Sequence, residues 1–106
     1  MIFYIILKEG DLMYKLLIVE DDFIIAKGLQ KHFEKYHYDV QYIEDFEHVL
    51  DEFLEFRPDL VLLDIHLPFF DGYYWCQEIR KISQVPIVFI SSANENMNIV
   101  LAMNMG

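Results

Sequence analysis

Acidic residues stand directly after two of the short apolar runs in this sequence. Glu20, Asp21 and Asp22 follow the first run, and Asp64 follows a later one. Carboxylates that are brought together repel one another, so a cation between them is favourable. Glu20, Asp21 and Asp64 offer the hard oxygen ligands that Mg²⁺ prefers, with water and phosphate oxygens completing its shell. These three residues are the candidate metal site; the alternative is that each is a solvated residue at the end of its strand.

A pair of hydroxyl side chains follows another apolar run. Ser91 and Ser92 come directly after the run that ends at Ile90, and their hydroxyls can donate hydrogen bonds to an oxyanion. A serine pair after a strand also serves as a turn or a helix N-cap. The nearby carboxylates favour a phosphate-binding role, and both readings stay open.

The apolar runs themselves predict four short strands, at residues 16–19, 40–43, 60–63 and 87–90. Helical periodicity separates them, with apolar residues spaced three and four apart. The expected stripes are Ile25, Leu29, Phe33 and Tyr36; Phe46, Val49, Leu50, Phe53 and Leu54, capped by Asp45; and Trp75, Ile79 and Ile82. A fourth helix is expected at about residues 95–105. This alternation predicts an α/β fold with a parallel sheet and helices on both faces, in which function lies outside the carboxyl ends of the strands.

Two segments carry a specific resemblance. The segment from Leu16 to Asp22 and the segment from Leu62 to Gly72 resemble the two signature stretches of response-regulator receiver domains. The resemblance covers residues 14–106. It implies a doubly wound parallel sheet of the flavodoxin or CheY-like kind, with strand order 2-1-3-4 for the strands present here.

The resemblance also implies roles for individual residues. Asp64 would be the phosphoacceptor. Mg²⁺ would be held by Asp21, Asp64 and the backbone carbonyl of His66, with Glu20 acting through water. Ser91 would be the switch hydroxyl that binds the phosphoryl group, and Ser92 lies at the neighbouring small-residue position.

Partners follow from the same resemblance. A sensor histidine kinase would donate the phosphoryl group, and a DNA-binding domain downstream would carry out transcription regulation, as in OmpR-type regulators. The stretch from Phe70 to Gln77, followed by Val85 and Pro86, resembles regulators that sense cell-envelope antibiotics in low-GC Gram-positive bacteria. A net charge of −10 would repel a phosphate backbone, so we expect no direct nucleic-acid binding by this segment.

The sequence departs from the family pattern at both ends. The family has a fifth strand and fifth helix, with a lysine that pairs with the phosphoryl group, and the sequence stops at Gly106 before them. We therefore expect an incomplete receiver domain at residues 13–106, no family lysine, and self-association through an open sheet edge. Residues 1–12 are an extra leader, which we interpret as a start-site artefact upstream of Met13; the alternative is a genuine added strand at residues 2–7.

Composition and individual residues argue against several other classes of protein. Apolar residues make up 55% of the chain and there is one cysteine, Cys76, which indicates a packed core without a disulfide. No apolar run approaches the roughly 18 residues of a membrane span, so we expect a cytoplasmic protein. A haloacid dehalogenase-like enzyme would need an aspartate where His66 stands. The remaining alternative is a receiver fold that serves only as a docking domain and does not switch.

Overall fold

The computed structural model describes residues 13–90, which form a four-stranded sheet with three helices. The elements in chain order are β1 (Lys15–Val19), α2 (Phe23–Glu34), β2 (Asp39–Tyr42), α3 (Val49–Phe56), β3 (Leu60–Asp64), α4 (Gly72–Arg80) and β4 (Ile87–Ile90). All strand pairs are parallel and the order is β2-β1-β3-β4, which confirms the expected α/β class and the order 2-1-3-4. The leader and the expected fourth helix lie outside the described residues.

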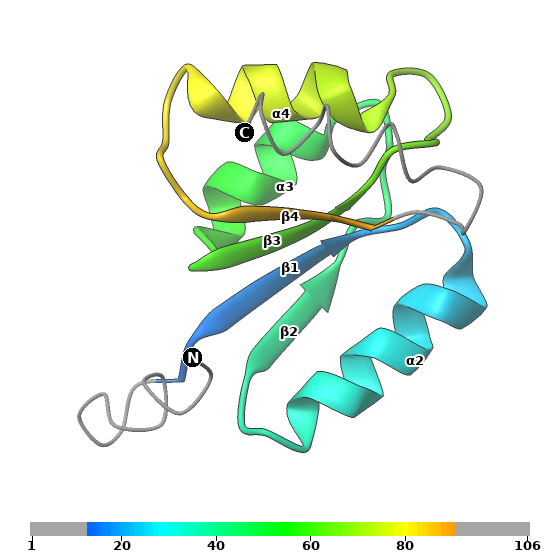
Figure 1. Ribbon diagram of the computed structural model, residues 1–106, viewed down its shortest axis with the longest axis vertical. Coiled ribbons are helices and arrows are strands. Elements are labelled where there is room, and N and C mark those ends of the chain that lie inside the picture. Colours follow the sequence, from blue (N-terminus) through cyan, green and yellow to red (C-terminus); the bar gives the residue numbers. More distant parts are fainter. Residues whose placement is uncertain (1–12, 91–106) are drawn as a thin grey trace.

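The sheet is covered unevenly on its two faces. Figure 1 shows α3 and α4 on one face and, of the described helices, α2 on the other. Successive side chains of a strand point to opposite faces, so the aliphatic residues 16–19 of β1 and 60–63 of β3 suit strands that are buried on both sides. The helices begin beside the carboxyl ends of the strands, where the acidic residues lie.

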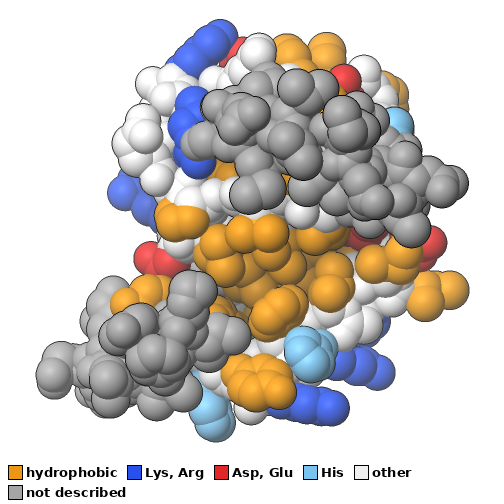
Figure 2. All heavy atoms as spheres, viewed as in Figure 1, with side chains coloured by type: hydrophobic (Ala, Val, Ile, Leu, Met, Phe, Trp, Pro, Cys, Tyr) orange, Lys and Arg blue, Asp and Glu red, His pale blue; other side chains and the backbone are white. Residues whose placement is uncertain are grey.

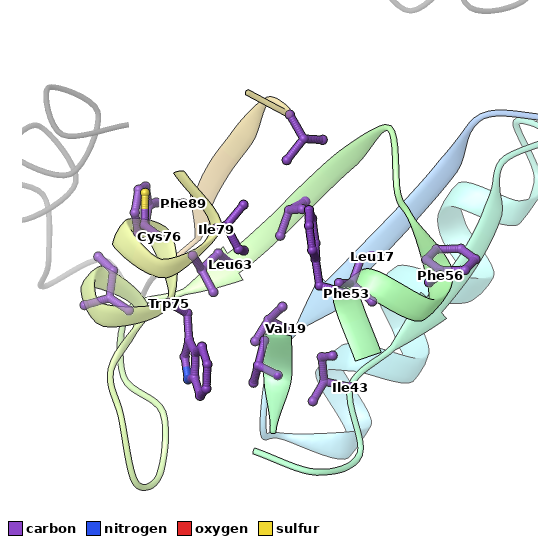
Figure 3. Close-up of a cluster of buried hydrophobic side chains, with 14 residues drawn as sticks. Leu17, Val19, Ile43, Phe53, Phe56, Leu63, Trp75, Cys76, Ile79 and Phe89 are labelled. Atoms are coloured by element: carbon purple, nitrogen blue, oxygen red, sulfur yellow. The ribbon is translucent and has the colours of Figure 1, made fainter. Parts of the chain in front are cut away.

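The larger core lies between the sheet and the pair α3 and α4. Figure 3 shows Ile79 of α4 close to Leu63 of β3, with Trp75 and Phe53 packed into the same cluster. Alternate strand residues face this cluster, and Leu63 and Ile79 are fully buried. Burial of a large aliphatic side chain contributes about 1.5–3 kcal/mol, so this face fixes how α4 sits on β3.

The second core is smaller because, among residues 13–90, α2 is the one helix on that face. α2 packs against β1 and β2, and Ala26 is its one buried residue. Val88 of β4 is 48% exposed, although it follows the same alternation as the buried Leu62 of β3. Figure 2 shows a continuous hydrophobic area on this side of the molecule.

Several local expectations were wrong. Asp45 does not cap α3, which begins at Val49 with His48 at the N-cap position and no side-chain cap. Asp45 instead accepts hydrogen bonds from the backbone N–H of Glu47 at 3.1 Å and from His48 Nδ1 at 2.8 Å, so its short side chain stabilises a turn before the helix. The turn leaves Phe46 outside α3, while Phe46 still packs against the core.

The predicted apolar stripes of the helices also included residues that are not buried. Ile82 follows the end of α4 and is 50% exposed, and Leu54 lies on the outer side of α3 at 48%. Ile25 and Tyr36 are about half exposed, at 48% and 49%. Ile25 lines the pocket beside Asp64, and α2 ends before Tyr36. Leu29 and Phe33 pack against the second core as expected.

Cys76 and three of the histidines differ in their exposure to solvent. Cys76 is buried and has no disulfide partner, and burial raises the pKa of its thiol. The histidines His32, His37 and His48 are exposed. In the part of the chain that the structure describes, no helix has the length and apolar character needed to cross a membrane.

Candidate functional site

The site is assembled by two adjacent parallel strands. Val19 of β1 pairs in register with Leu63 of β3, so the residues that follow, Glu20 and Asp64, end their strands side by side. The strands are aliphatic over residues 16–19 and 60–63, and the next residue of each chain segment is acidic. The aliphatic segments hold the strands in the core, and the carboxylates lie where the chain leaves it.

Three carboxylates converge at this edge. One oxygen from each of Glu20, Asp21 and Asp64 lies within 4.8 Å of the others. Glu20 and Asp64 are 8% and 9% exposed, whereas Asp21 is exposed. The three residues that the sequence predicted as a metal site are therefore brought together by the fold.

Backbone hydrogen bonds orient the two buried carboxylates. The Asp22 N–H donates to Glu20 Oε2 at 3.0 Å, and the His66 N–H donates to Asp64 Oδ1 at 3.4 Å. The Glu20 and Asp64 carboxyl groups also lie close enough that, beyond the effect of burial, the Asp64 carboxylate raises the pKa of Glu20. Each carboxylate is thus held by the main chain of its own loop, which limits how far it can move.

Asp22 has a different structural role from Glu20 and Asp21. Its Oδ1 accepts hydrogen bonds from the N–H groups of Ile24 at 3.0 Å and Ile25 at 3.2 Å. These bonds satisfy N–H groups in the first turn of α2, which have no partner within the helix. Asp22 is therefore a helix cap and stands outside the carboxylate cluster.

The electrostatics of the cluster favour a cation. Burial raises the pKa of the Glu20 carboxyl from its ordinary 4.5 to about 7, and the charges of Asp64 and Asp21 act in the same direction. Burial likewise raises the pKa of the Asp64 carboxyl. Negative charge is thus costly here without a counter-ion. The donor set consists of oxygens alone, and a partly buried oxygen set with one exposed side fits Mg²⁺, which keeps several waters.

A pocket opens beside the carboxylates and gives access to Asp64. Its volume is about 440 Å³, and it is lined by Glu20, Asp22, Ile25, Leu29, Asp64, His66 and Ile90. It combines two buried carboxylates with an apolar wall from α2 and β4. A group that enters from solvent can therefore reach the Asp64 carboxylate while it remains partly shielded from water.

Sequence reasoning missed one residue of the site. Gly72 begins α4 and its N–H donates to the Ile65 carbonyl at 2.8 Å. A Cβ at this position would overlap the Asp64 carbonyl oxygen, so a residue without a side chain is required. The signal in the sequence was the Asp71-Gly72 pair at the end of the segment from Leu62 to Gly72.

Three predicted site residues remain to be placed: His66, Ser91 and Ser92. His66 is exposed and lines the pocket beside Asp64; the role of its carbonyl as a metal ligand stays a prediction. Ser91 and Ser92 lie outside the described residues, although Ile90, which precedes them, lines the same pocket.

Comparisons with known proteins agree with this geometry. Residues 16–106 match the model of the response regulator receiver domain. The chain is 52% identical over 94 residues to the transcriptional regulatory protein YvcP of Bacillus subtilis, covering 89% of this chain and 40% of that protein. It is 44% identical over 92 residues to the response regulator protein GraR of Staphylococcus aureus, covering 87% and 41%. The chain thus spans about two fifths of the length of these relatives.

Solved structures give the same result. The N-terminal domain of the nisin resistance regulator NsrR, a lantibiotic response regulator, is 45% identical with a TM-score of 0.80, over 90% of this chain and 80% of that one. The BeF3-activated N-terminal receiver domain of Klebsiella pneumoniae RstA is 35% identical with a TM-score of 0.80, over 87% and 79%. The parallel sheet, the carboxylates at the ends of β1 and β3, and these likenesses agree that the chain belongs to the response regulator receiver domain family.

Proposed function

We propose that this chain is the phosphoacceptor module of a two-component system, and that it takes a phosphoryl group onto Asp64 with Mg²⁺ bound beside it. The observation that carries the proposal is the convergence of Glu20, Asp21 and Asp64 within 4.8 Å at one edge of the sheet. Asp64 is the member of this group that ends the strand β3, between β1 and β4, and it opens into the pocket.

The carboxylates would have different roles in binding the ion. Asp21 and Asp64, together with the His66 carbonyl, would hold Mg²⁺, and Glu20 would act through a water molecule. The ion would supply charge neutralisation at the phosphoryl oxygens. The Asp22 N–H holds the Glu20 carboxylate in place. The negative charge that would attract the ion is therefore positioned before the ion binds.

The reaction needs an oxygen nucleophile and little other covalent help from the protein. A carboxylate oxygen of Asp64 attacks the phosphorus of a phosphohistidine on a sensor kinase. A P–O bond forms, the P–N bond breaks, and the histidine nitrogen takes up a proton from solvent. The His66 N–H, 3.4 Å from Asp64 Oδ1, holds the carboxylate in one orientation during the attack.

The proposed output of the switch is inferred from the relatives of this chain. YvcP is described as a transcriptional regulatory protein and GraR as a response regulator, and both are more than twice as long as this chain. We propose that the present segment controls a DNA-binding output domain in the same way. Ser91 would bind the phosphoryl group and transmit its arrival, with Ser92 beside it.

Phosphorylation by a small donor tests the proposal directly. Acetyl phosphate with Mg²⁺ should label the chain once, and Asp64→Ala should abolish the labelling while circular dichroism remains unchanged. Beryllofluoride, which activates the Klebsiella relative, offers a second probe of the same site by tryptophan fluorescence. Retained labelling in Asp64→Ala would show that another residue is the phosphoacceptor.

Asp59 provides a matched control. It precedes β3 at the opposite end of the strand and accepts a hydrogen bond from the Lys15 N–H at 2.9 Å. Asp59→Ala removes an aspartate from the same segment of chain and should leave labelling unchanged. A folded parent chain that responds to neither acetyl phosphate nor beryllofluoride would support the alternative of a docking domain that does not switch.

A further inference from the structure

Asp22 lies at the junction between the carboxylate cluster and α2. Its Oδ1 accepts hydrogen bonds from the N–H groups of Ile24 at 3.0 Å and Ile25 at 3.2 Å, and its carbonyl accepts one from the Ala26 N–H at 2.9 Å. These three bonds tie Asp22 to the first turn of the helix. Its own N–H donates outside the helix, to Glu20 Oε2 at 3.0 Å. One residue therefore joins α2 to a buried carboxylate.

The helix is a firm anchor for this residue because it is fixed on the sheet at several points. Ala26 is 1% exposed, and Leu29 packs against the same cluster beneath the helix. Gln30 Nε2 donates to the Val40 carbonyl of β2 at 3.1 Å. Figure 1 shows the chain passing from the end of β1 through a short turn into α2. The packing of α2 therefore sets the direction of the Asp22 N–H.

The Glu20 carboxylate needs such an anchor because its neighbours repel it. Glu20 is 8% exposed, and carboxylate oxygens of Glu20, Asp21 and Asp64 lie within 4.8 Å of one another. An ionised carboxylate without a donor in this position would turn away from the other two charges. The Asp22 N–H opposes that rotation with a hydrogen bond to a charged acceptor, which is stronger than a bond between neutral groups.

We propose that Asp22 is a positioning residue for Mg²⁺ binding: its side chain caps α2, and the cap holds the Asp22 N–H where it fixes the Glu20 carboxylate. This role rests on the proposed function, which places Mg²⁺ among Glu20, Asp21 and Asp64. Asp22 acts through Glu20, and the ligands of the ion remain those of the proposed site. Removal of a group that orients the groups around a metal typically weakens metal binding by about 10- to 100-fold.

The alternative is that Asp22 caps the helix and has no effect on the ion. Asparagine and serine cap helices about as well as aspartate, whereas alanine does not. Asp22→Asn and Asp22→Ala therefore remove the same charge and differ in the cap. Loss of a cap alone would lower the stability of Asp22→Ala and leave its Mg²⁺ affinity equal to that of Asp22→Asn. A positioning role changes both quantities in Asp22→Ala.

Calorimetric titration of the folded chains with Mg²⁺ separates these two cases. Asp22→Ala should bind Mg²⁺ about tenfold more weakly than Asp22→Asn, and Asp22→Ser should bind as tightly as Asp22→Asn. Val40→Ala controls for lost stability, because Val40 is buried beneath α2 and pairs with Leu16 near the start of β1, away from the site. It should keep the Mg²⁺ affinity of the parent.

Two further measurements test whether the cap acts through Glu20. In a Glu20→Ala background the alanine and asparagine variants of Asp22 should bind Mg²⁺ equally, since a double-mutant cycle reports the coupling between the two positions. In the metal-free chain, NMR should place the amide proton of residue 22 downfield in the parent and in Asp22→Asn. It should move upfield in Asp22→Ala, because the bond to the Glu20 carboxylate is lost.

The possible failures are distinguishable. Equal Mg²⁺ affinities in Asp22→Asn and Asp22→Ala would overturn the positioning role alone and would leave Asp22 a helix cap. A tenfold difference that persists in the Glu20→Ala background would also overturn it, because the cap would then act by another route. A folded parent chain that binds no Mg²⁺ would overturn the metal site of the proposed function, and this role with it.

Discussion

Gly72, the first residue of α4, lies against the backbone of Asp64 with no room for a side chain between them. A Cβ at Gly72 would overlap the Asp64 carbonyl oxygen and would lie 3.0 Å from both the Asp64 carbonyl carbon and the Ile65 Cα. The Gly72 N–H donates to the Ile65 carbonyl at 2.8 Å. The start of α4 thus fixes the end of β3, and with it the direction of the Asp64 carboxylate.

Substitution of this glycine should disturb both stability and the site. Gly72→Ala forces the loop after β3 to move, and we expect a loss of about 1–3 kcal/mol in the free energy of unfolding. The shift displaces Asp64 relative to Glu20, so Mg²⁺-dependent labelling by acetyl phosphate should also slow. Chemical denaturation and a labelling time course measure the two effects.

Gly28 is the matched control for this change. It lies within α2, and a Cβ there would meet no atom within 4 Å. Gly28→Ala should stabilise the domain by about 0.5–1 kcal/mol, because alanine loses less backbone entropy in a helix. A Gly72→Ala chain that is as stable as the parent would contradict the close packing described here.

The sheet and the carboxylates were predictable because their signals are local. Short apolar runs mark β1, β3 and β4, whereas β2 alternates polar and apolar residues. The runs at Leu16 and Leu60 end in Glu20 and Asp64. Parallel order then brings those ends to one edge without knowledge of any tertiary contact. The grouping of Glu20, Asp21 and Asp64 follows from this argument alone.

Other features depend on tertiary contacts and turns, which the hydrophobic periodicity of the sequence does not reveal. The requirement for glycine at position 72 arises from the Asp64 backbone, which approaches only after β3 and α4 have packed. The true start of α3 depends on a turn in which Asp45 bonds to His48. Ile25 matched a buried stripe, yet its side chain is half exposed, because it lines the open pocket beside Asp64.

Arg57 offers a second test of backbone conformation. It ends α3 in the left-handed region, with φ 54° and ψ 65°, and its N–H donates to the Phe53 carbonyl at 2.8 Å. A residue with a Cβ is strained there by about 1–2 kcal/mol. Arg57→Gly should therefore raise the free energy of unfolding by about 1 kcal/mol, whereas Arg57→Ala keeps the Cβ and should not. Equal stabilities of the two variants in denaturant would contradict the strain.

The three acidic residues after β1 should differ in their effect on Mg²⁺ affinity. Asp21→Asn removes a direct ligand charge, and we expect binding to weaken by at least about tenfold, or 1.4 kcal/mol. Glu20→Gln should weaken it less, because Glu20 would act through water. Asp22→Asn removes the same charge as Asp21→Asn but keeps an N-cap acceptor for α2, so it controls for the general loss of negative charge.

Titration with Mg²⁺, followed by Trp75 fluorescence or calorimetry, measures these affinities. Trp75 is suited to report on the site because it contacts Phe70, in the loop that follows Asp64, with ring centroids 5.6 Å apart. Equal losses in Asp21→Asn and Asp22→Asn would mean that the ion responds to net charge and not to a ligand at Asp21.

The stability of the metal-free domain should fall as the pH rises from about 4.5 to 7. In the folded state burial, aided by the charges of Asp64 and Asp21, raises the pKa of Glu20 from 4.5 to about 7. The folded state therefore holds the proton more tightly than the unfolded state does. Its stabilising contribution is complete below pH 4.5 and is lost as the pH rises through the folded pKa. Burial raises the pKa of Asp64 as well, which gives a contribution of the same sign.

Glu20→Gln should flatten this decline, because glutamine has no proton to release and preserves the size of the side chain. Saturating Mg²⁺ should reduce the decline in the parent, since the ion stabilises the ionised carboxylates, and should change the pH dependence of Glu20→Gln less. Free energies of unfolding from urea titrations at pH 4.5, 5.5 and 7 measure the slopes, at the pH limits set by the Glu20 pKa values. Parallel slopes for the parent and Glu20→Gln without Mg²⁺ would show that the Glu20 pKa is not raised, and that charge at this edge of the sheet is already balanced before a cation binds.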